Sequence, residues 1–113
     1  MEKNNIFEKI ISRQIKSDII FQDKRVTAFK DIRPKYPVHI LIVPNTKIVS
    51  SNEINENNKY ILTDIFFTAI NIAKKMGIHN SGYRLILNCN NHGRQEIPHL
   101  HVHLIGGELL KNI

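Results

Sequence analysis

The run Val38-His39-Ile40-Leu41-Ile42-Val43 most constrains how this chain can fold. It is the most apolar and most β-branched stretch of the sequence, and Pro44 closes it. Such runs are typical of strands inside a sheet, because β-branched side chains pack well on a pleated surface and a continuous apolar run needs cover on both faces. The sequence therefore predicts a central strand over residues 38–43, with His39 near its beginning.

Patterns on either side of this run predict the remaining elements. Residues 3–15 place apolar side chains at helical spacing and indicate a short amphipathic helix. Residues 59–76 repeat that spacing over a longer stretch, and Gly77 follows as a C-terminal stop, which indicates the long helix. Further strand-like runs cover residues 19–22, 26–29, 83–88 and 99–105. This order predicts one α+β domain over residues 1–113, with a mainly antiparallel sheet.

Composition excludes several classes of protein. The chain has 113 residues, a formal net charge of +6 and one cysteine, Cys89, so an intramolecular disulfide is impossible. Its basic residues are scattered rather than clustered, and we expect no nucleic-acid partner. We also expect no membrane partner, because no apolar run is long enough to cross a bilayer. The first residues lack the features of a signal peptide, so we expect a cytoplasmic protein.

Three histidines stand at alternate positions in His99-Leu-His101-Val-His103-Leu-Ile105. In a strand, alternate side chains point to opposite faces, so the histidines would line one face while the aliphatic residues face the core. Neighbouring imidazoles would then stand about 7 Å apart. Imidazoles bind zinc, and they also act as nucleophiles and acid–base groups near neutral pH.

Three interpretations of this row of imidazoles remain open on sequence alone. Zinc binding would need ring nitrogens that converge on one ion, whereas side chains two apart on a strand project in parallel, and no acidic ligand stands beside the histidines in the sequence. A merely solvated face would suit one histidine better than three in strict alternation. Phosphoryl chemistry fits the row best, because a neutral imidazole attacks phosphorus and leaves again once protonated.

The histidine row and several other segments resemble the histidine triad superfamily, in its Hint branch of nucleotide-binding proteins. The triad matches the pattern His-φ-His-φ-His-φ-φ, where φ is an apolar residue, and Gly106-Gly107 follows it directly. The other matching segments, in the family's order, are residues 6–11, 19–21, 28–34, 37–44, 82–84 and Asn88. The resemblance thus extends over about residues 6–107. It implies a five-stranded sheet with one long and one short helix, and a homodimer whose two sheets join into ten strands.

The resemblance also implies an activity, the hydrolysis of the P–N bond of purine nucleoside 5′-monophosphoramidates. His101 would be the nucleophile that forms a nucleotidyl-histidine intermediate. His103 and His39 would bracket the phosphate and move protons, while His99 would orient the site from behind. No metal or other cofactor is required by that mechanism. Alternatives are a dinucleoside polyphosphate hydrolase of the same superfamily, or a nucleotide-binding scaffold without turnover.

Further residues correspond to the nucleotide-binding parts of the family. Asp31 matches the acidic residue that bonds the ribose hydroxyls, and Asn88 matches an amide that contacts phosphate or ribose. The apolar slot for the purine corresponds to Ile6, Phe7, Ile10, Phe29 and Ile32, residues that could equally be ordinary core. Gln95 and Glu96 belong to the loop that contacts the phosphate.

The chain departs from the family at three places. The loop before the triad reads Arg94-Gln95-Glu96, where animal members commonly have Gly-Gln-Ser. A carboxylate at position 96 would repel an anionic phosphate unless it turns outward or Arg94 compensates. Pro98 stands where an aromatic residue is frequent, and the tail after Gly107 lacks the tryptophan of animal members.

Overall fold

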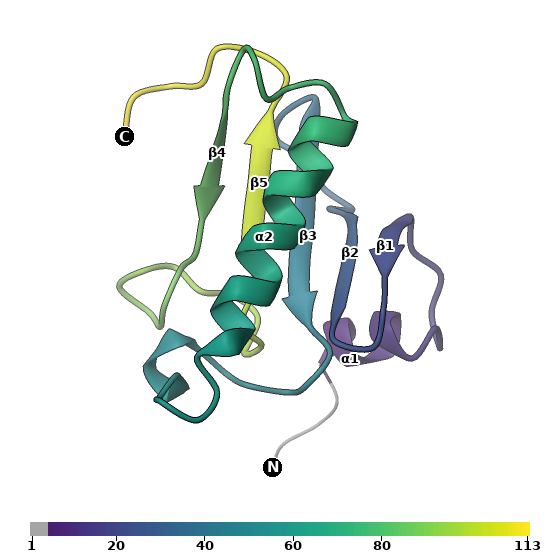
Figure 1. Cartoon of the computed structure of the whole chain (residues 1–113), viewed down its shortest axis with the longest axis vertical. Helices are drawn as coiled ribbons and strands as arrows, with labels where there is room; N and C mark the ends of the chain where they lie inside the picture. Colours follow the sequence, from purple (N-terminus) through teal and green to yellow (C-terminus); the bar gives the residue numbers. More distant parts are fainter. Residues whose placement is uncertain (1–4) are drawn as a thin grey trace.

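The computed structural model describes residues 5–113, so residues 3 and 4 of the predicted first helix lie outside the described residues. The elements follow in the order α1 (Ile6–Ile11), β1 (Ile19–Gln22), β2 (Val26–Lys30), β3 (Val38–Pro44), the 3-10 helix η1 (Ser51–Glu53), α2 (Tyr60–Lys75), β4 (Tyr83–Ile86) and β5 (Val102–Gly106). The strands form one five-stranded sheet in the order β1-β2-β3-β5-β4, with every neighbouring pair antiparallel (Figure 1). The predicted α+β class, the two helices and the central position of residues 38–43 are confirmed.

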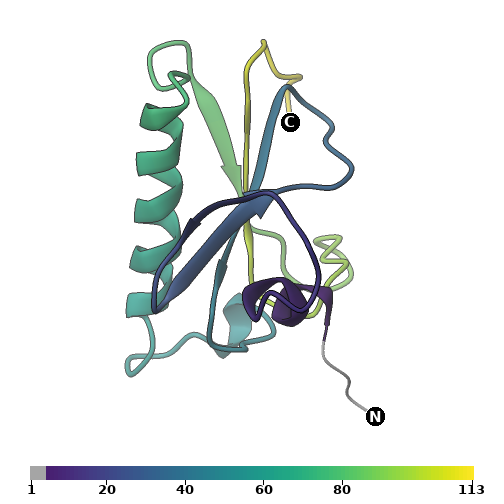
Figure 2. The same ribbon diagram turned by 90° about the vertical axis from the view of Figure 1, so that its right-hand side faces the viewer.

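The larger core lies between the sheet and α2. Figure 2 shows α2 along one side of the sheet, with α1 and the loop that precedes β5 on the other. Strand alternation turns Ile40 and Ile42 of β3 and Leu104 of β5 toward α2, where Ile65 and Ala69 meet them. Each aliphatic side chain fully buried there contributes roughly 1.5–3 kcal/mol. Within residues 5–113, no helix is long and apolar enough to cross a membrane.

A smaller apolar cluster, the α1-side cluster, covers the opposite face. Phe7 and Ile10 of α1 pack against Phe29 of β2 and against Leu41 and Val43 of β3. Because alternate residues share a face, this is also the face on which β3 carries His39 and β5 carries His103. The helix α1 therefore covers only part of this face and leaves the histidine-bearing part beside it.

The helix α1 is shorter than the predicted span of residues 3–15. It begins with a capping box in which the Asn5 side chain accepts from Glu8 N–H and the Glu8 carboxylate accepts from Asn5 N–H. It ends because Arg13 adopts the left-handed conformation, with φ of 63°, one residue past the C-cap Ser12. Ile15 lies beyond this stop, so its periodic spacing did not signify helix.

Strand β5 is also shorter than predicted: it begins at Val102, whereas the alternation suggested a strand from His99. The backbone of the preceding residues bonds outside the sheet, since Leu100 N–H donates to Ile48 C=O at 2.7 Å. The neighbouring strand β3 cannot extend the ladder either. Pro44 has no N–H to donate, and its carbonyl accepts from the His99 ring.

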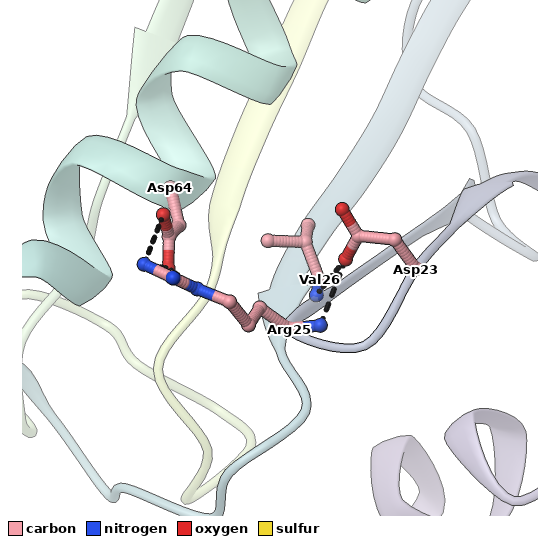
Figure 3. Close-up of polar contacts among 4 residues, drawn as sticks. All are labelled: Asp23, Arg25, Val26 and Asp64. Atoms are coloured by element: carbon pink, nitrogen blue, oxygen red, sulfur yellow. Dashed lines mark hydrogen bonds and ion pairs between the residues drawn. The ribbon is translucent and has the colours of Figure 1, made fainter.

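A cluster of polar contacts ties the β1–β2 turn to α2 (Figure 3). The Asp23 carboxylate accepts the backbone N–H groups of Arg25 and Val26 at 2.8 Å each, which closes the turn. The Arg25 guanidinium donates two hydrogen bonds of 2.9 Å to Asp64 of α2 and lies 4.9 Å from the centre of the Tyr60 ring. These contacts connect the edge of the sheet to the long helix, on the side away from the histidines.

Candidate active site

The structure brings the four predicted catalytic histidines into one row along β3, from His39 near its beginning to His99 beside Pro44 at its end. His39 lies on β3 and His103 on β5, and their rings meet at 3.1 Å between His39 Nε2 and His103 Nδ1. His101 stands just before β5, with its ring centre 5.0 Å from that of His103. His99 lies two residues earlier and is fully buried. The rings are thus close enough to act as one unit, although only His103 of the triad lies within a strand.

His101 has the tautomer that a nucleophile needs. Its Nδ1 lies 2.6 Å from the backbone oxygen of His99, and because a carbonyl only accepts, Nδ1 must carry the proton. The other ring nitrogen, Nε2, therefore keeps its lone pair in the neutral ring. This hydrogen bond fixes both the orientation of the ring and the nitrogen that can attack.

His39 is fixed by a backbone donor in the opposite sense. The N–H of Lys35 donates to His39 Nδ1 at 3.1 Å, so the proton of the neutral ring resides on Nε2. That proton faces two acceptors, His103 Nδ1 at 3.1 Å and the Asp31 carboxylate at 3.3 Å. Because His103 accepts at Nδ1, its own proton lies on Nε2. The pair thereby presents His103 Nε2–H as a donor.

The buried His99 ring is held by hydrogen bonds to other parts of the protein. Its Nε2–H donates to Pro44 C=O at 2.8 Å, and its Nδ1 accepts from the Asn5 side chain at 3.4 Å. Both ring nitrogens are therefore engaged within the protein. The sequence reasoning missed Asn5, although the capping-box pattern Asn5-x-x-Glu8 marks it as the residue that begins α1.

Aromatic contacts hold the same rings from the α1 side. The Phe7 ring lies 5.0 Å from that of His101 and 5.9 Å from that of His99, both nearly edge-to-face. Its third neighbour is Phe29, at 5.4 Å. Edge-to-face pairs of this kind are favourable and directional, so α1 helps to set the angle of the His101 ring.

Burial keeps the imidazoles neutral. It lowers the pKa of His103 from 6.5 to about 4, assisted by the neighbouring rings of His101 and His39. Burial likewise lowers the pKa of His39, His99 and His101. For His101, the hydrogen bond to the His99 carbonyl and the carboxylates of Asp31 and Glu96 oppose that effect. Neutral rings at neutral pH are what a nucleophilic imidazole requires.

The loop between β4 and β5 places Gln95 and Glu96 differently. Both polar atoms of the Gln95 side-chain amide form hydrogen bonds within the protein. Its Nε2 donates to the carbonyls of Val49 and Ile97, and its Oε1 accepts from Asn90 N–H. Gln95 therefore holds the loop in place, and its predicted contact with substrate stays a prediction. Glu96 has an exposed side chain whose charge acts on His101.

Asn88 follows β4 at the same end of the sheet. The last paired residue of that strand, Ile86, lies opposite His103, and Asn88 stands two residues further along, with its side chain partly exposed. Its predicted contact with phosphate or ribose stays a prediction.

The five apolar residues predicted for a purine slot divide into two groups. Phe7, Ile10 and Phe29 are buried in the α1-side cluster, which agrees with the alternative that they are ordinary core. Ile6 is 43% exposed and Ile32 is 88% exposed. These two are the members of the set with apolar surface free to cover a ligand.

The same geometry allows a test of metal binding. One ligand atom each from Asp31, His39 and His103 lie within 4.8 Å of one another, so an acidic group does stand beside the histidines, contrary to the expectation from sequence. A metal-bound histidine offers one nitrogen to the ion and donates a hydrogen bond from the other. His39 does the reverse, since its Nδ1 accepts from Lys35 and its Nε2 carries the proton. The donor set therefore fits a hydrogen-bonded relay rather than a metal ligand set.

Most of the chain is similar in sequence to known proteins. A family model described as the HIT domain matches residues 12–109. The purine nucleoside phosphoramidase of Escherichia coli is 48% identical over 110 residues, which covers 97% of this chain and 92% of that protein. The protein named adenylylsulfatase HINT1 from Arabidopsis thaliana is 41% identical over 104 residues, and the alignment covers 90% of this chain and 70% of that protein. The solved structure of a HIT family hydrolase from Clostridium thermocellum superposes with a TM-score of 0.94 at 45% identity, and covers 100% of this chain and 98% of that one.

Proposed function

The chain belongs to the HIT family of hydrolases, and on that premise we propose that it cleaves the P–N bond of purine nucleoside 5′-monophosphoramidates through a covalent intermediate on His101. The observation that carries the proposal is the 2.6 Å hydrogen bond from His101 Nδ1–H to the His99 carbonyl, which leaves Nε2 with a free lone pair. The E. coli relative supports the substrate class, because its name is that of a purine nucleoside phosphoramidase.

The reaction has two displacement steps at phosphorus. In the first, the His101 Nε2 lone pair forms a bond to phosphorus, and the electrons of the P–N bond go to the departing amine. The His39–His103 pair takes up one proton from solvent when the substrate binds, so His103 Nε2–H can pass a proton to the amine and the pair returns to its neutral form. In the second, a water oxygen bonds to phosphorus, the His101–phosphorus bond breaks with its electrons returning to Nε2, and the proton released by water replaces the one given to the amine. The products are a nucleoside monophosphate and a free amine.

The nucleotide would lie over the histidine face beside α1. We place the purine against the exposed apolar side chains of Ile6 and Ile32, and the ribose hydroxyls near the Asp31 carboxylate, which can accept from them. Asn88 would contact the phosphate or ribose, since it follows by two residues the β4 residue Ile86, which pairs with His103. No metal or other cofactor takes part in this scheme.

Two substrates and one variant test the proposal. Purified protein is incubated with adenosine 5′-phosphoramidate and with diadenosine polyphosphates, alongside His101→Ala. We expect AMP release from the phosphoramidate, loss of that release in His101→Ala, and a nucleotidylated wild-type protein in rapid-quench mass spectra. Faster release from the polyphosphates would favour the dinucleoside polyphosphate hydrolase instead. No release from either would leave a nucleotide-binding protein without turnover, and undiminished release by His101→Ala would refute the covalent step.

We propose further that the protein is a cytoplasmic homodimer joined through β4 and α2. Strand β4 is an edge of the sheet, and an edge strand has unpaired backbone groups that a second copy can pair with. On α2, the Phe67 side chain is 61% exposed, and a second copy packed against this helix would cover its apolar surface. Sedimentation should give a dimer for the wild type and a smaller species for Phe67→Glu. A wild-type monomer at micromolar concentration would refute the assembly.

A further inference from the structure

We propose that Asp31 is a positioning residue for proton transfer: its carboxylate holds the His39 ring and competes with His103 for the proton on His39 Nε2. This role rests on the proposed function and is distinct from the ribose contact that the family resemblance implies for Asp31. Asp31 would act on the reaction through the two imidazoles even where the substrate has no ribose hydroxyl to offer.

The protein itself fixes the Asp31 carboxylate. Its Oδ1 accepts Arg33 N–H at 2.9 Å, and its Oδ2 lies 3.3 Å from His39 Nε2. The backbone N–H of Asp31 donates to His39 C=O at 3.0 Å. Main chain and side chain therefore both connect Asp31 to His39, and the His39 side chain is buried while that of Asp31 is only 20% exposed. A residue that served only to meet an incoming ribose would not need this second set of contacts.

A single proton faces two acceptors at His39. Lys35 N–H occupies Nδ1, so Nε2 has one proton to share between Asp31 Oδ2 and His103 Nδ1. When a ligand takes the carboxylate away, the whole hydrogen bond passes to His103. The state of Asp31 therefore decides how firmly His103 is held, and with it the direction of the His103 Nε2–H donor.

The charged groups around His39 and His103 also support a role for Asp31 in proton transfer. Asp31 and Lys35 of the β2–β3 loop and His103 of β5 face His39, and His101 faces His103. Asp31 supplies the negative charge next to His39, and it counters the lowering of the pKa by burial at His39, His101 and His103 alike. Replacement of this carboxylate by an amide must therefore lower the pKa of all three rings still further.

The experiment compares the wild type with variants at Asp31 and Asp18 on two substrates. The variants are Asp31→Asn, which keeps the Oδ1 acceptor for Arg33 N–H, and Asp18→Asn, a matched control that removes an exposed carboxylate from another loop. The substrates are adenosine 5′-phosphoramidate and its 2′,3′-dideoxy analogue, with kcat and KM measured from pH 4.5 to 8.5. Asp31→Glu tests rescue by a carboxylate. Spectra of the ring nitrogens by ¹H–¹⁵N NMR report the His39 tautomer and pKa without turnover.

A positioning role for Asp31 predicts specific changes in kcat and in the pH profile. Asp31→Asn should lower kcat about tenfold or more with both substrates, since positioned acid–base groups contribute about 10²–10⁴-fold. It should also move the acid limb of the pH profile to lower pH by about one unit, while Asp18→Asn leaves both unchanged and Asp31→Glu recovers part of kcat. An effect that disappears with the dideoxy substrate would reduce Asp31 to a ribose contact and overturn the inference. If the wild type hydrolysed neither substrate, the proposed function would be lost, and an unchanged His39 spectrum in Asp31→Asn would then refute the positioning role separately.

Discussion

Acidification should destabilise this protein well before its carboxylates are protonated. The perturbation is the charging of histidines that the fold buries in neutral form. The clearest case is His103, whose pKa falls from 6.5 to about 4 on burial among other imidazoles. Between these two values the unfolded chain binds the proton and the folded chain does not. The contribution to stability is therefore complete above pH 6.5, and it decreases as the pH falls toward 4.

The structure also sets the size of this effect. One pKa unit corresponds to about 1.4 kcal/mol, so full protonation at His103 would cost the fold at most about 3 kcal/mol, and at pH 5 about 2 kcal/mol. The ring is partly exposed, and solvent screening should reduce these figures to about half. Burial lowers the pKa of His39, His99 and His101 in the same direction, so their contributions add in sign.

Urea denaturation at fixed ionic strength, from pH 7.5 down to 5, measures the free energy of unfolding directly. We expect a decrease of about 1 kcal/mol or more attributable to His103, and a correspondingly smaller decrease in His103→Asn. The matched control is His79→Asn, which changes an exposed histidine outside the site. If the wild-type free energy of unfolding stayed level over this range, or if His103→Asn kept the full decrease, the claim that burial holds these rings neutral would be wrong.

Other changes test the surroundings of the site. Gly93→Ala would place a Cβ 2.5 Å from a backbone oxygen of the same loop, and we expect a loss of about 1–3 kcal/mol by urea denaturation. Phe7→Leu removes three edge-to-face ring contacts, so the free energy of unfolding should fall by about 1–2 kcal/mol. It should also lower kcat, because His101, the proposed nucleophile, loses a support; an unchanged kcat would contradict that support. A double-mutant cycle on Arg25→Ala and Asp64→Ala should give a coupling of about 0.5–1 kcal/mol that 1 M salt removes, and a salt-independent coupling would rule out an exposed ion pair.

Periodicity predicted most of the scaffold from the sequence. The apolar β-branched run became β3, between β2 and β5, and the helical spacing over residues 59–76 became α2. These succeeded because both segments are long and their patterns agree with the burial that the fold imposes. The shorter N-terminal pattern overran its helix, since the left-handed backbone at Arg13 stops α1 before Ile15 can join it. Local backbone conformation of that kind is not encoded in apolar spacing.

The site was predictable in its residues and only partly in its geometry. The imidazole row and the resemblance identified the histidines, which do gather within hydrogen-bond or ring contact. The tautomers could not be derived, because they depend on backbone groups: Lys35 N–H at His39, and the carbonyls of His99 and Pro44. Every residue type supplies a backbone carbonyl and every type except proline supplies an N–H, so the sequence gives no signal for these partners.

The late start of β5 has a wider consequence for how such sites can be recognised or built. The His99 carbonyl can accept a hydrogen bond from the His101 ring because the chain at His99 has not yet joined the ladder with β3. Within a regular strand, the same carbonyl would face a neighbouring strand and accept a hydrogen bond from one of its N–H groups. A His-x-His-x-His pattern grafted onto the middle of an ordinary strand would reproduce the spacing of the rings without the tautomer. A designer must therefore transfer the irregular backbone of residues 99–101 before β5 together with the histidines.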